Sequence, residues 1–239
     1  MTGEAGVERT KMGEEQPQMN ELLRPTYFLD FDHPHVARFA EETTRNASSA
    51  RQRAVALFYA VRDGIRYDPY TISASRADYC ASAVLGSESA YCIPKAVLLA
   101  ASTRAVGIPT RLGFADVRNH LASEKLLARL GTDLFIYHGY VEMWLGQRWV
   151  KATPAFNVEL CQRFGVHPLE FDGRHDALFH EYSVDGRRHM EYLAVRGAYE
   201  DLPYEEIIDA FLAQYGTAVL ATSEREHDGL FHSGAATQG

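Results

Sequence analysis

The chain has 239 residues, of which 46% are hydrophobic and 11% aromatic, and its formal net charge is -8 at pH 7. This length and apolar content predict one substantial hydrophobic core and favour a single domain. The acidic balance and the lack of any run of Lys and Arg argue against nucleic acid as a partner, because a phosphate backbone is bound by clustered positive charge.

The N-terminus and the cysteine content indicate the cellular compartment. The first residues are acidic and polar, whereas a secretory signal needs a basic start and an apolar core. No apolar run approaches the roughly 20 residues that span a bilayer. The three cysteines, an odd number, do not form a disulfide framework. We therefore expect a cytoplasmic protein with free thiols and no membrane partner.

Composition separates a core from two tails. Residues 1–20 are rich in Glu, Gly, Gln and Lys without apolar periodicity, and the chain ends in Ser-Gly-Ala-Ala-Thr-Gln-Gly. No repeat, low-complexity tract or linker divides the segment between them. We expect flexible tails at 1–20 and 218–239 and one domain over 21–217.

Apolar spacing predicts helices in the first half of the core, at 35–40 and 50–65. Residues 66–91 mix Tyr, Ser, Asp and Gly and are typical of a long, mostly irregular connection. A third helix follows from Cys92, with Pro94 suited to its first turn and Gly107 to the residue just past its end. This helix is apolar almost all round, so we expect it to be central and buried.

The second half is predicted to be rich in strands. Gly146-Gln147 is typical of a two-residue turn, and Asp185-Gly186 predicts a second hairpin because this pair tolerates positive φ. The expected strands are 110–117, 134–145, 148–153, 179–184 and 187–194, and the expected helices are 122–130 and 204–214. Helices followed by an antiparallel sheet indicate an α+β fold.

Cys92 is the first candidate for chemistry, because it falls at or just before the first turn of the buried helix. A thiol there faces unpaired backbone N–H groups and the positive end of the helix dipole, which predict a lowered thiol pKa. The same N–H groups can hold an oxyanion. A core thiol is the competing interpretation, since free cysteines are among the most buried residues.

His138 is the candidate base, because a nucleophilic cysteine needs a base that is distant in sequence and near in space. It is expected in the middle of a strand, where a packing histidine would be the preferred interpretation without Cys92. Alternation along the strand predicts one face with His138, Tyr140, Glu142 and Trp144, and the other with Tyr137, Gly139, Val141 and Met143.

Counting back from the Gly146-Gln147 turn sets His138 opposite Ala155, with Thr153 and Asn157 as diagonal neighbours on the same face. Both side chains can accept a hydrogen bond from the imidazole and hold its tautomer. Neither brings the negative charge of an aspartate. Pro154 is expected to distort the strand at this point.

The segment 91–111, Tyr-Cys-Ile-Pro-Lys-Ala-Val-Leu-Leu-Ala-Ala-Ser-Thr-Arg-Ala-Val-Gly-Ile-Pro-Thr-Arg, resembles the nucleophile helix of transglutaminase-like proteins. In that family a Cys opens a helix that runs into Arg-Ala-x-Gly-Ile-Pro-x-Arg and a strand. Residues 32–34 and 60–67 resemble the two leading helices, and residues 138–143 and 149–154 resemble the His strand and the Trp strand. The resemblance spans roughly 27–157 and implies a papain-like fold with Cys92 as nucleophile and His138 as base.

One position departs from the family. The resemblance implies an Asp immediately before the Pro of the last motif, where this chain has Thr153 before Pro154. Loss of that carboxylate weakens stabilisation of the imidazolium. Asn157 is the expected substitute, because a Cys-His-Asn arrangement recurs in papain-like enzymes. We therefore expect Asn157→Ala to lower turnover more than Thr153→Ala.

Four further residues are candidates for substrate binding. Tyr91 precedes the nucleophile, and Tyr140 lies on the strand face of the base. Arg118 and His120 follow the strand that leads from the Cys helix, where a solvated helix cap is an equally good explanation.

No metal or cofactor is expected. The spacing of His175, His180 and His189 matches no Cys/His zinc pattern, no HExxH motif is present, and there is no Gly-rich phosphate loop. Cys80 and Cys161 are interpreted as buried or incidental thiols.

The sequence thus predicts an α+β, papain-like transglutaminase core that acts on a peptide, protein or small amide substrate. Cys92 would form an acyl-enzyme, which water resolves in a hydrolase or protease and an amine resolves in an acyltransferase. The alternative is a catalytically weakened member that serves as a binding or scaffold domain. Retention of both Cys92 and His138 argues against that alternative.

Overall fold

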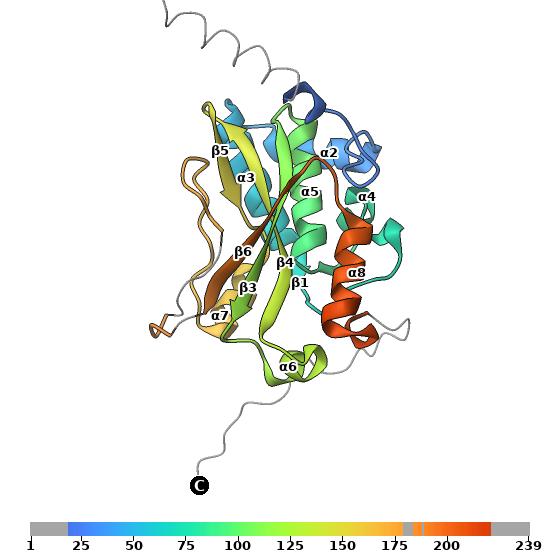
Figure 1. Cartoon of the computed structure of the whole chain (residues 1–239). Coiled ribbons are helices and arrows are strands. Elements are labelled where there is room, and N and C mark those ends of the chain that lie inside the picture. The colour runs from blue at the N-terminus through green and yellow to red at the C-terminus, as the bar shows by residue number, and fades with distance from the viewer. Residues whose placement is uncertain (1–18, 179–183, 188, 221–239) are drawn as a thin grey trace, which may run out of the picture.

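The computed structural model describes residues 19–178, 184–187 and 189–220. Helices lie on one side of a four-stranded sheet, with α5 (Cys92–Ala105) packed directly against it (Figure 1). This is the expected α+β arrangement of a Cys-bearing helix on an antiparallel sheet.

The first part of the described chain is helical. Ser49 caps the second long helix by accepting the N–H of Gln52. Two short strands pair in parallel, so that Tyr67 faces Ala90 two residues before Cys92. The elements are α2 (Pro34–Thr44), α3 (Ala50–Gly64), β1 (Arg66–Tyr67), η1 (Arg76–Tyr79), α4 (Ala81–Leu85) and β2 (Ser89–Ala90). The connection at 66–91 is therefore more structured than expected.

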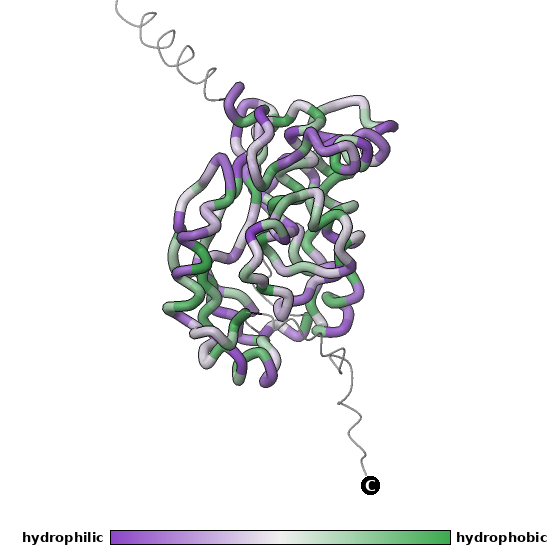
Figure 2. The backbone as a smooth tube through the Cα atoms, turned by 90° about the vertical axis from the view of Figure 1, so that its right-hand side faces the viewer, coloured by the Kyte–Doolittle hydropathy of each residue, from purple (hydrophilic) through white to green (hydrophobic). Residues whose placement is uncertain are grey.

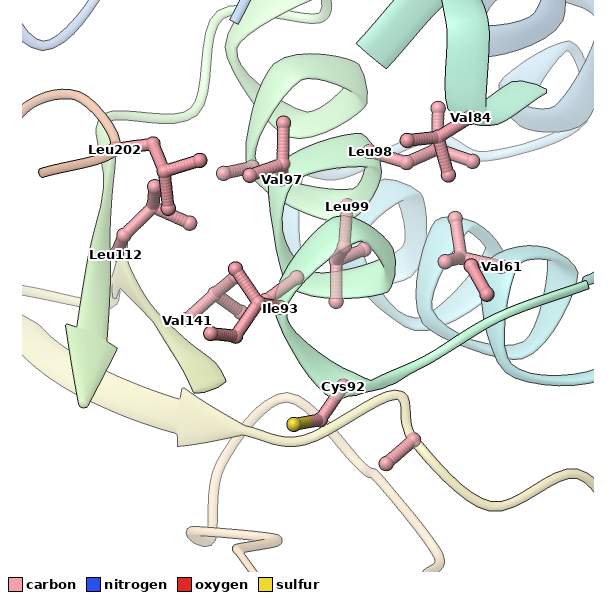
Figure 3. Close-up of a cluster of buried hydrophobic side chains, with 14 of the residues drawn as sticks. Val61, Val84, Cys92, Ile93, Val97, Leu98, Leu99, Leu112, Val141 and Leu202 are labelled. Carbon is pink, nitrogen blue, oxygen red and sulfur yellow. The ribbon is translucent and has the colours of Figure 1, made fainter. Parts of the chain in front are cut away.

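Helix α5 is the centre of the molecule. Every residue from Cys92 to Arg104 is buried, as the apolar sequence predicts. Ile93 points to Val141 on the sheet, and Leu98 points to Val84 of α4 (Figure 3). The helix therefore has apolar partners on both sides, and its N-terminus is fixed between the helical layer and the sheet.

The sheet has the order β5-β4-β3-β6, and its neighbouring strands run antiparallel. Leu145 pairs with Arg148, which confirms the register that the Gly146-Gln147 turn predicts. Both turn residues have positive φ, as a type I′ turn requires. The strands are β3 (Thr110–Asn119), β4 (Leu134–Leu145), β5 (Arg148–Ala152) and β6 (Met190–Tyr199), and the helices are α6 (Glu124–Leu130), α7 (Val158–Phe164), α8 (Tyr204–Tyr215) and η2 (Thr217–Val219).

Some expected elements differ from the structure. Helix α7 was not predicted, and β6 begins at Met190 and pairs with β3. The strand expected at 179–184 and part of its hairpin lie outside the described residues. The expected tails are also largely outside them, although the described chain continues past 217 through η2, where Val219 is buried.

Hydrophobic residues run through the middle of the helical layer, and hydrophilic residues gather on its outer turns (Figure 2). Among the described residues no helix is both long enough and apolar enough to cross a membrane. The deepest part of the core lies between α5 and β4, where the candidate site begins.

Candidate active site

Cys92 is the first residue of α5, with Tyr91 as the N-cap. Its side chain is 8% exposed, and its sulfur projects outward from the start of α5 (Figure 3). The backbone N–H groups of Gly139, Ile93 and Cys92 itself donate to the sulfur. Gly139 approaches closely, because a Cβ there would lie 3.1 Å from the Cα of Ile93 and 3.4 Å from the carbonyl oxygen of Cys92. The residue after His138 therefore contacts the start of the Cys helix.

The protonation state of the thiol differs from the expectation. Burial raises the pKa of the Cys92 thiol to about 11, and the N–H donors of Gly139 and Ile93 lower it only in part. The prediction of a lowered pKa from the helix N-terminus is therefore wrong for this structure. The physical reason is that the free energy lost when a thiolate is removed from water exceeds the stabilisation that a few N–H dipoles provide.

His138 lies in β4 and is 5% exposed. Its side chain lines a pocket with Thr153, and we call this the His138 pocket. Its residues are His138, Thr153, Ala155, Phe156, Leu169, Leu178 and Met190. Within the described part of the chain, neither Nε2 of His138 nor Oγ1 of Thr153 has a hydrogen-bond partner, although both atoms are buried. Two polar residues with unpaired buried atoms therefore line an otherwise apolar pocket.

Asn157 has other partners. It is the N-cap of α7, and its Oδ1 accepts the N–H of Tyr67 at 3.1 Å. Its Nδ2 donates to Glu159 at 2.6 Å. Thr153 is in the His138 pocket, and Asn157 is not among the residues that line it. The catalytic role of Asn157 stays a prediction, and this arrangement favours Thr153 as the neighbour of the imidazole.

The two candidate catalytic side chains are both neutral in this structure. Burial lowers the pKa of His138 to about 4, so its imidazole is uncharged at pH 7 beside an uncharged thiol. No hydrogen bond joins the Cys92 sulfur to the His138 ring in the described coordinates. Such contacts are often long before substrate binds. Both candidate groups are therefore buried and uncharged in the resting structure.

The charge state of Cys92 affects the pKa of three tyrosines. Burial is the main cause that raises the pKa of Tyr67, Tyr91 and Tyr215, and a negative charge on Cys92 would add to the shift in each case. Tyr215, at the end of α8, accepts the N–H of Ile136 at 2.7 Å. A charge on Cys92 would therefore be felt by three tyrosines from different parts of the chain.

The two candidate tyrosines for substrate binding are buried. The hydroxyl of Tyr91 donates to that of Tyr79 at 3.0 Å. Tyr140 is 1% exposed and its ring covers Gly113, where a Cβ would lie 2.2 Å from a ring carbon. Burial, followed by Glu142, raises the pKa of Tyr140 to about 12. Both residues form part of the walls around the site in the closed structure, and their contact with substrate stays a prediction.

Arg118 and His120 lie at the end of β3, the same end of the sheet at which α5 begins (Figure 1). Arg118 belongs to the strand and contacts Asp133 at 3.3 Å. His120 contacts Glu191 at 3.3 Å. The helix-cap explanation does not apply, because α6 is capped by Ser123. Their proposed place at a substrate entrance stays a prediction.

Metal-ligating residues do not gather in the described part of the chain: no group of three or more His, Cys, Asp or Glu side chains is arranged to hold an ion there. His175 contacts Asp172 at 2.7 Å, and His189 stacks on Phe156 with ring centroids 5.9 Å apart. His180 lies outside the described residues. All three cysteines are free.

The structure adds residues to the site that the sequence analysis did not identify. Gly139 contacts the helix start, and Tyr67 and Tyr215 lie near the thiol. Asp116 accepts the N–H of Tyr137, the residue before His138, at 3.1 Å. An aspartate within the apolar strand segment Leu-Gly-Phe-Ala-Asp-Val was the one signal that pointed to such a role.

Comparison with family models supports the assignment of the fold. Residues 37–154 match the family model of the transglutaminase-like superfamily. A solved structure from Cytophaga hutchinsonii, provisionally described as a cysteine protease, is similar with a TM-score of 0.45 and 12% sequence identity. The alignment covers 76% of this chain and 54% of that one, so the chain spans about half the length of that protein. No curated protein matches the chain at a significant level.

Proposed function

Because the chain contains a transglutaminase-like superfamily domain over residues 37–154, we propose that it is a cysteine-dependent enzyme that cleaves or transfers acyl groups at amide or ester bonds. The observation that carries the proposal is the contact between Gly139 and the start of α5. This contact joins the strand that bears His138 to the thiol of Cys92 at the N-terminus of a buried helix.

The proposed reaction has two half-reactions. In the first, His138 takes the proton from the Cys92 thiol while the sulfur attacks the carbonyl carbon of the substrate. The N–H groups at the start of α5 stabilise the developing oxyanion. The carbon–nitrogen or carbon–oxygen bond then breaks, the leaving group takes the proton from His138, and a thioester remains on Cys92. Water or an amine attacks the thioester, with His138 as base again, and releases the acyl product.

Thr153 is our preferred third member of the site. Thr153 and His138 line one pocket, and within the described residues Oγ1 of Thr153 and Nε2 of His138 have no hydrogen-bond partner. A hydroxyl there can accept the imidazole N–H and hold one tautomer. A hydroxyl supplies no negative charge, so it stabilises the imidazolium less than an aspartate does.

The substrate class follows from this chemistry. A peptide, protein or small amide fits an acyl donor, and the second half-reaction decides between hydrolysis and amide formation. The free thiols are consistent with a reducing compartment, and we place the protein in the cytoplasm on that basis. The buried thiol and the low pKa of His138 further imply that the site opens when substrate binds.

Acylation by p-nitrophenyl acetate tests the proposal, with peptide mapping by mass spectrometry. We expect the acetyl group on Cys92, with little on Cys80 and Cys161, which serve as internal controls in the same chain. His138→Gln should lower the acylation rate of Cys92 by roughly 100-fold or more, because general base catalysis contributes about that factor. Cys92→Ala should abolish the burst of nitrophenol.

A specific observation favours the second candidate, a binding or scaffold domain without catalysis. The thiol and the imidazole are both buried and neutral, and no carboxylate stands at position 153. This candidate is supported if folded protein acylates Cys92 no faster than Cys161, which is also buried. An equal rate for Cys92 in wild type and in His138→Gln would remove His138 from the mechanism.

A further inference from the structure

The strand β4 contains a bulge directly before His138. Ala115 of β3 pairs with His138, and Val117 pairs with Phe135. Asp116 therefore stands opposite two residues of β4, Ile136 and Tyr137. An extra residue in one strand reverses the alternation of side chains on the far side of the bulge. His138 itself lies between the bulge and the hairpin turn, where β3 and β4 pair regularly from Ala115 to Thr110. The bulge therefore leaves the face of His138 unchanged and determines the backbone directly before it.

Tyr137 holds the bulge in a conformation that is unusual for a tyrosine. Its φ is 54, in the left-handed region that side chains other than glycine rarely adopt. Its ring is nevertheless buried, with 2% exposed. A backbone of this kind persists only where the surrounding structure compensates for it, and it is typical of functional sites.

Asp116 and Arg196 provide the compensation. Oδ1 of Asp116 accepts the backbone N–H of Tyr137 at 3.1 Å. Both carboxylate oxygens accept from Arg196, whose Nε and Nη2 lie 2.8 Å from Oδ1 and Oδ2. The guanidinium carbon of Arg196 lies 4.4 Å from the centre of the Tyr137 ring. The ion pair of Asp116 and Arg196 therefore holds both the backbone N–H and the ring of Tyr137. We call this pair the Asp116 clamp.

We propose that Asp116 is a positioning residue for His138: the Asp116 clamp holds Tyr137 in its left-handed conformation and so fixes the direction of the imidazole within the His138 pocket. The inference rests on the proposed function for its catalytic consequence. The placement of His138 itself is a separate, measurable property. Asp116 acts through the backbone of Tyr137 and touches neither Cys92 nor a substrate.

A purely structural ion pair is the competing explanation, and the same two strands supply its matched control. Arg111 of β3 and Glu142 of β4 form a comparable pair, with Nε and Nη2 of Arg111 both 2.7 Å from Oε2. This pair lies in a regular part of the ladder, where Arg111 faces Glu142 directly. Glu142→Ala therefore removes a carboxylate of similar burial without altering the bulge.

The test combines three variants with the control. Asp116→Ala removes the acceptor and the charge, and Asp116→Asn keeps one acceptor for the Tyr137 N–H. The double variant Asp116→Ala with Tyr137→Gly supplies a residue that adopts positive φ without strain. The measurements are the NMR titration and tautomer of the His138 ring, the rate of Cys92 acylation by p-nitrophenyl acetate, and urea unfolding.

We expect Asp116→Ala to move the His138 pKa upwards by about one unit or more towards its ordinary value, because a displaced imidazole regains water. Acylation of Cys92 should fall roughly 10-fold to 100-fold, as a small misplacement of a catalytic group does. Adding Tyr137→Gly to Asp116→Ala should restore most of the wild-type His138 pKa and most of the Cys92 acylation rate. Asp116→Asn should give values of the His138 pKa and the acylation rate between those of wild type and Asp116→Ala. Glu142→Ala should change neither the His138 pKa nor the acylation rate.

Two results would overturn the proposal: an unchanged His138 titration in folded Asp116→Ala, or no recovery in the double variant. If Asp116→Ala does not fold, Asp116→Asn is compared with wild type instead. The proposal then requires an upward shift of the His138 pKa in Asp116→Asn. A shift of the His138 titration in a protein whose Cys92 is never acylated would support the clamp and contradict the proposed enzyme.

Discussion

The two ends of helix α5 differ in how completely their buried polar groups are hydrogen-bonded. At the C-terminal end, Arg104 donates to the carbonyl oxygens of Thr110, Arg24 and Glu200, at 2.8, 3.1 and 2.6 Å. Thr103 and Thr110 hydroxyls lie 2.8 Å apart. The polar groups of this end join the helix to the start of β3 and to two distant segments of the chain.

At the N-terminal end Lys95 is paired in the same way, since its Nζ donates to the carbonyl oxygens of Arg62 and Ile65, but the candidate catalytic groups are buried without such partners. In the described part of the chain, Nε2 of His138 and Oγ1 of Thr153 lack a hydrogen-bond partner, and the thiol of Cys92 has only backbone donors. A buried polar atom that lacks a partner lowers stability. The contrast indicates that one end of α5 is built for stability and that the other retains unpaired groups for chemistry.

The largest expected effect is at the stable end. Arg104→Ala leaves three carbonyl oxygens without their donor, so we expect the free energy of unfolding to fall by about 3–5 kcal/mol. Urea unfolding followed by circular dichroism measures it. In Arg104→Lys, which keeps the charge and loses the planar guanidinium, the free energy of unfolding should fall by less. An Arg104→Ala variant as stable as wild type would remove the distinction between the two ends.

The second effect is on pH dependence and belongs to the reactive end. Burial lowers the pKa of His138 to about 4, so the folded state binds fewer protons than the unfolded state between about pH 4 and 6.5. Stability contributed by the neutral ring is therefore present above pH 6.5 and is lost as pH falls to 4. From these two pKa values the loss is on the order of 3 kcal/mol.

His138→Gln should reduce this loss when the free energy of unfolding is measured from pH 7 to pH 4. Part of the loss of stability will remain in His138→Gln, because the pKa of His189 is also lowered to about 4, first by burial and second by His120. An identical pH dependence in wild type and His138→Gln would mean that the imidazole is not buried in its neutral form.

A third effect concerns the contact between the two candidate catalytic residues. An alanine Cβ at position 139 would lie 3.1 Å from the Cα of Ile93, so Gly139→Ala must push β4 away from the start of α5. We expect a loss of about 1–3 kcal/mol in unfolding free energy and a marked fall in the acylation rate of Cys92. Gly64→Ala is the control, because a Cβ there meets no atom within 4 Å.

The smallest effect on stability is expected at Thr153. Its Oγ1 has no partner among the described residues, so Thr153→Val should change the unfolding free energy by less than about 1 kcal/mol. The rate of Cys92 acylation should nevertheless fall, and fall more than in Asn157→Ala. The opposite order of the two rates would assign the role to Asn157, as the sequence alone favours.

Local features of the sequence predicted much of the scaffold. Pro94 and Gly107 bound the Cys helix closely, and the Gly146-Gln147 turn predicted the register of β4 with β5. The bulge at Tyr137 escaped prediction, because Asp116 and Arg196 hold it from positions far away in the chain. Strand alternation counted from one turn cannot detect an inserted residue.

The sequence by itself determined that a thiol opens a buried helix and that a histidine strand follows, since caps, turns and apolar runs act between near neighbours in the chain. Tertiary structure alone determined the charge state of the Cys92 thiol and which polar residue shares a pocket with His138. Burial raises the pKa of Cys92, and packing brings Thr153 rather than Asn157 into the His138 pocket. Both outcomes depend on solvent exclusion and on contacts between distant segments, which residue order does not encode locally.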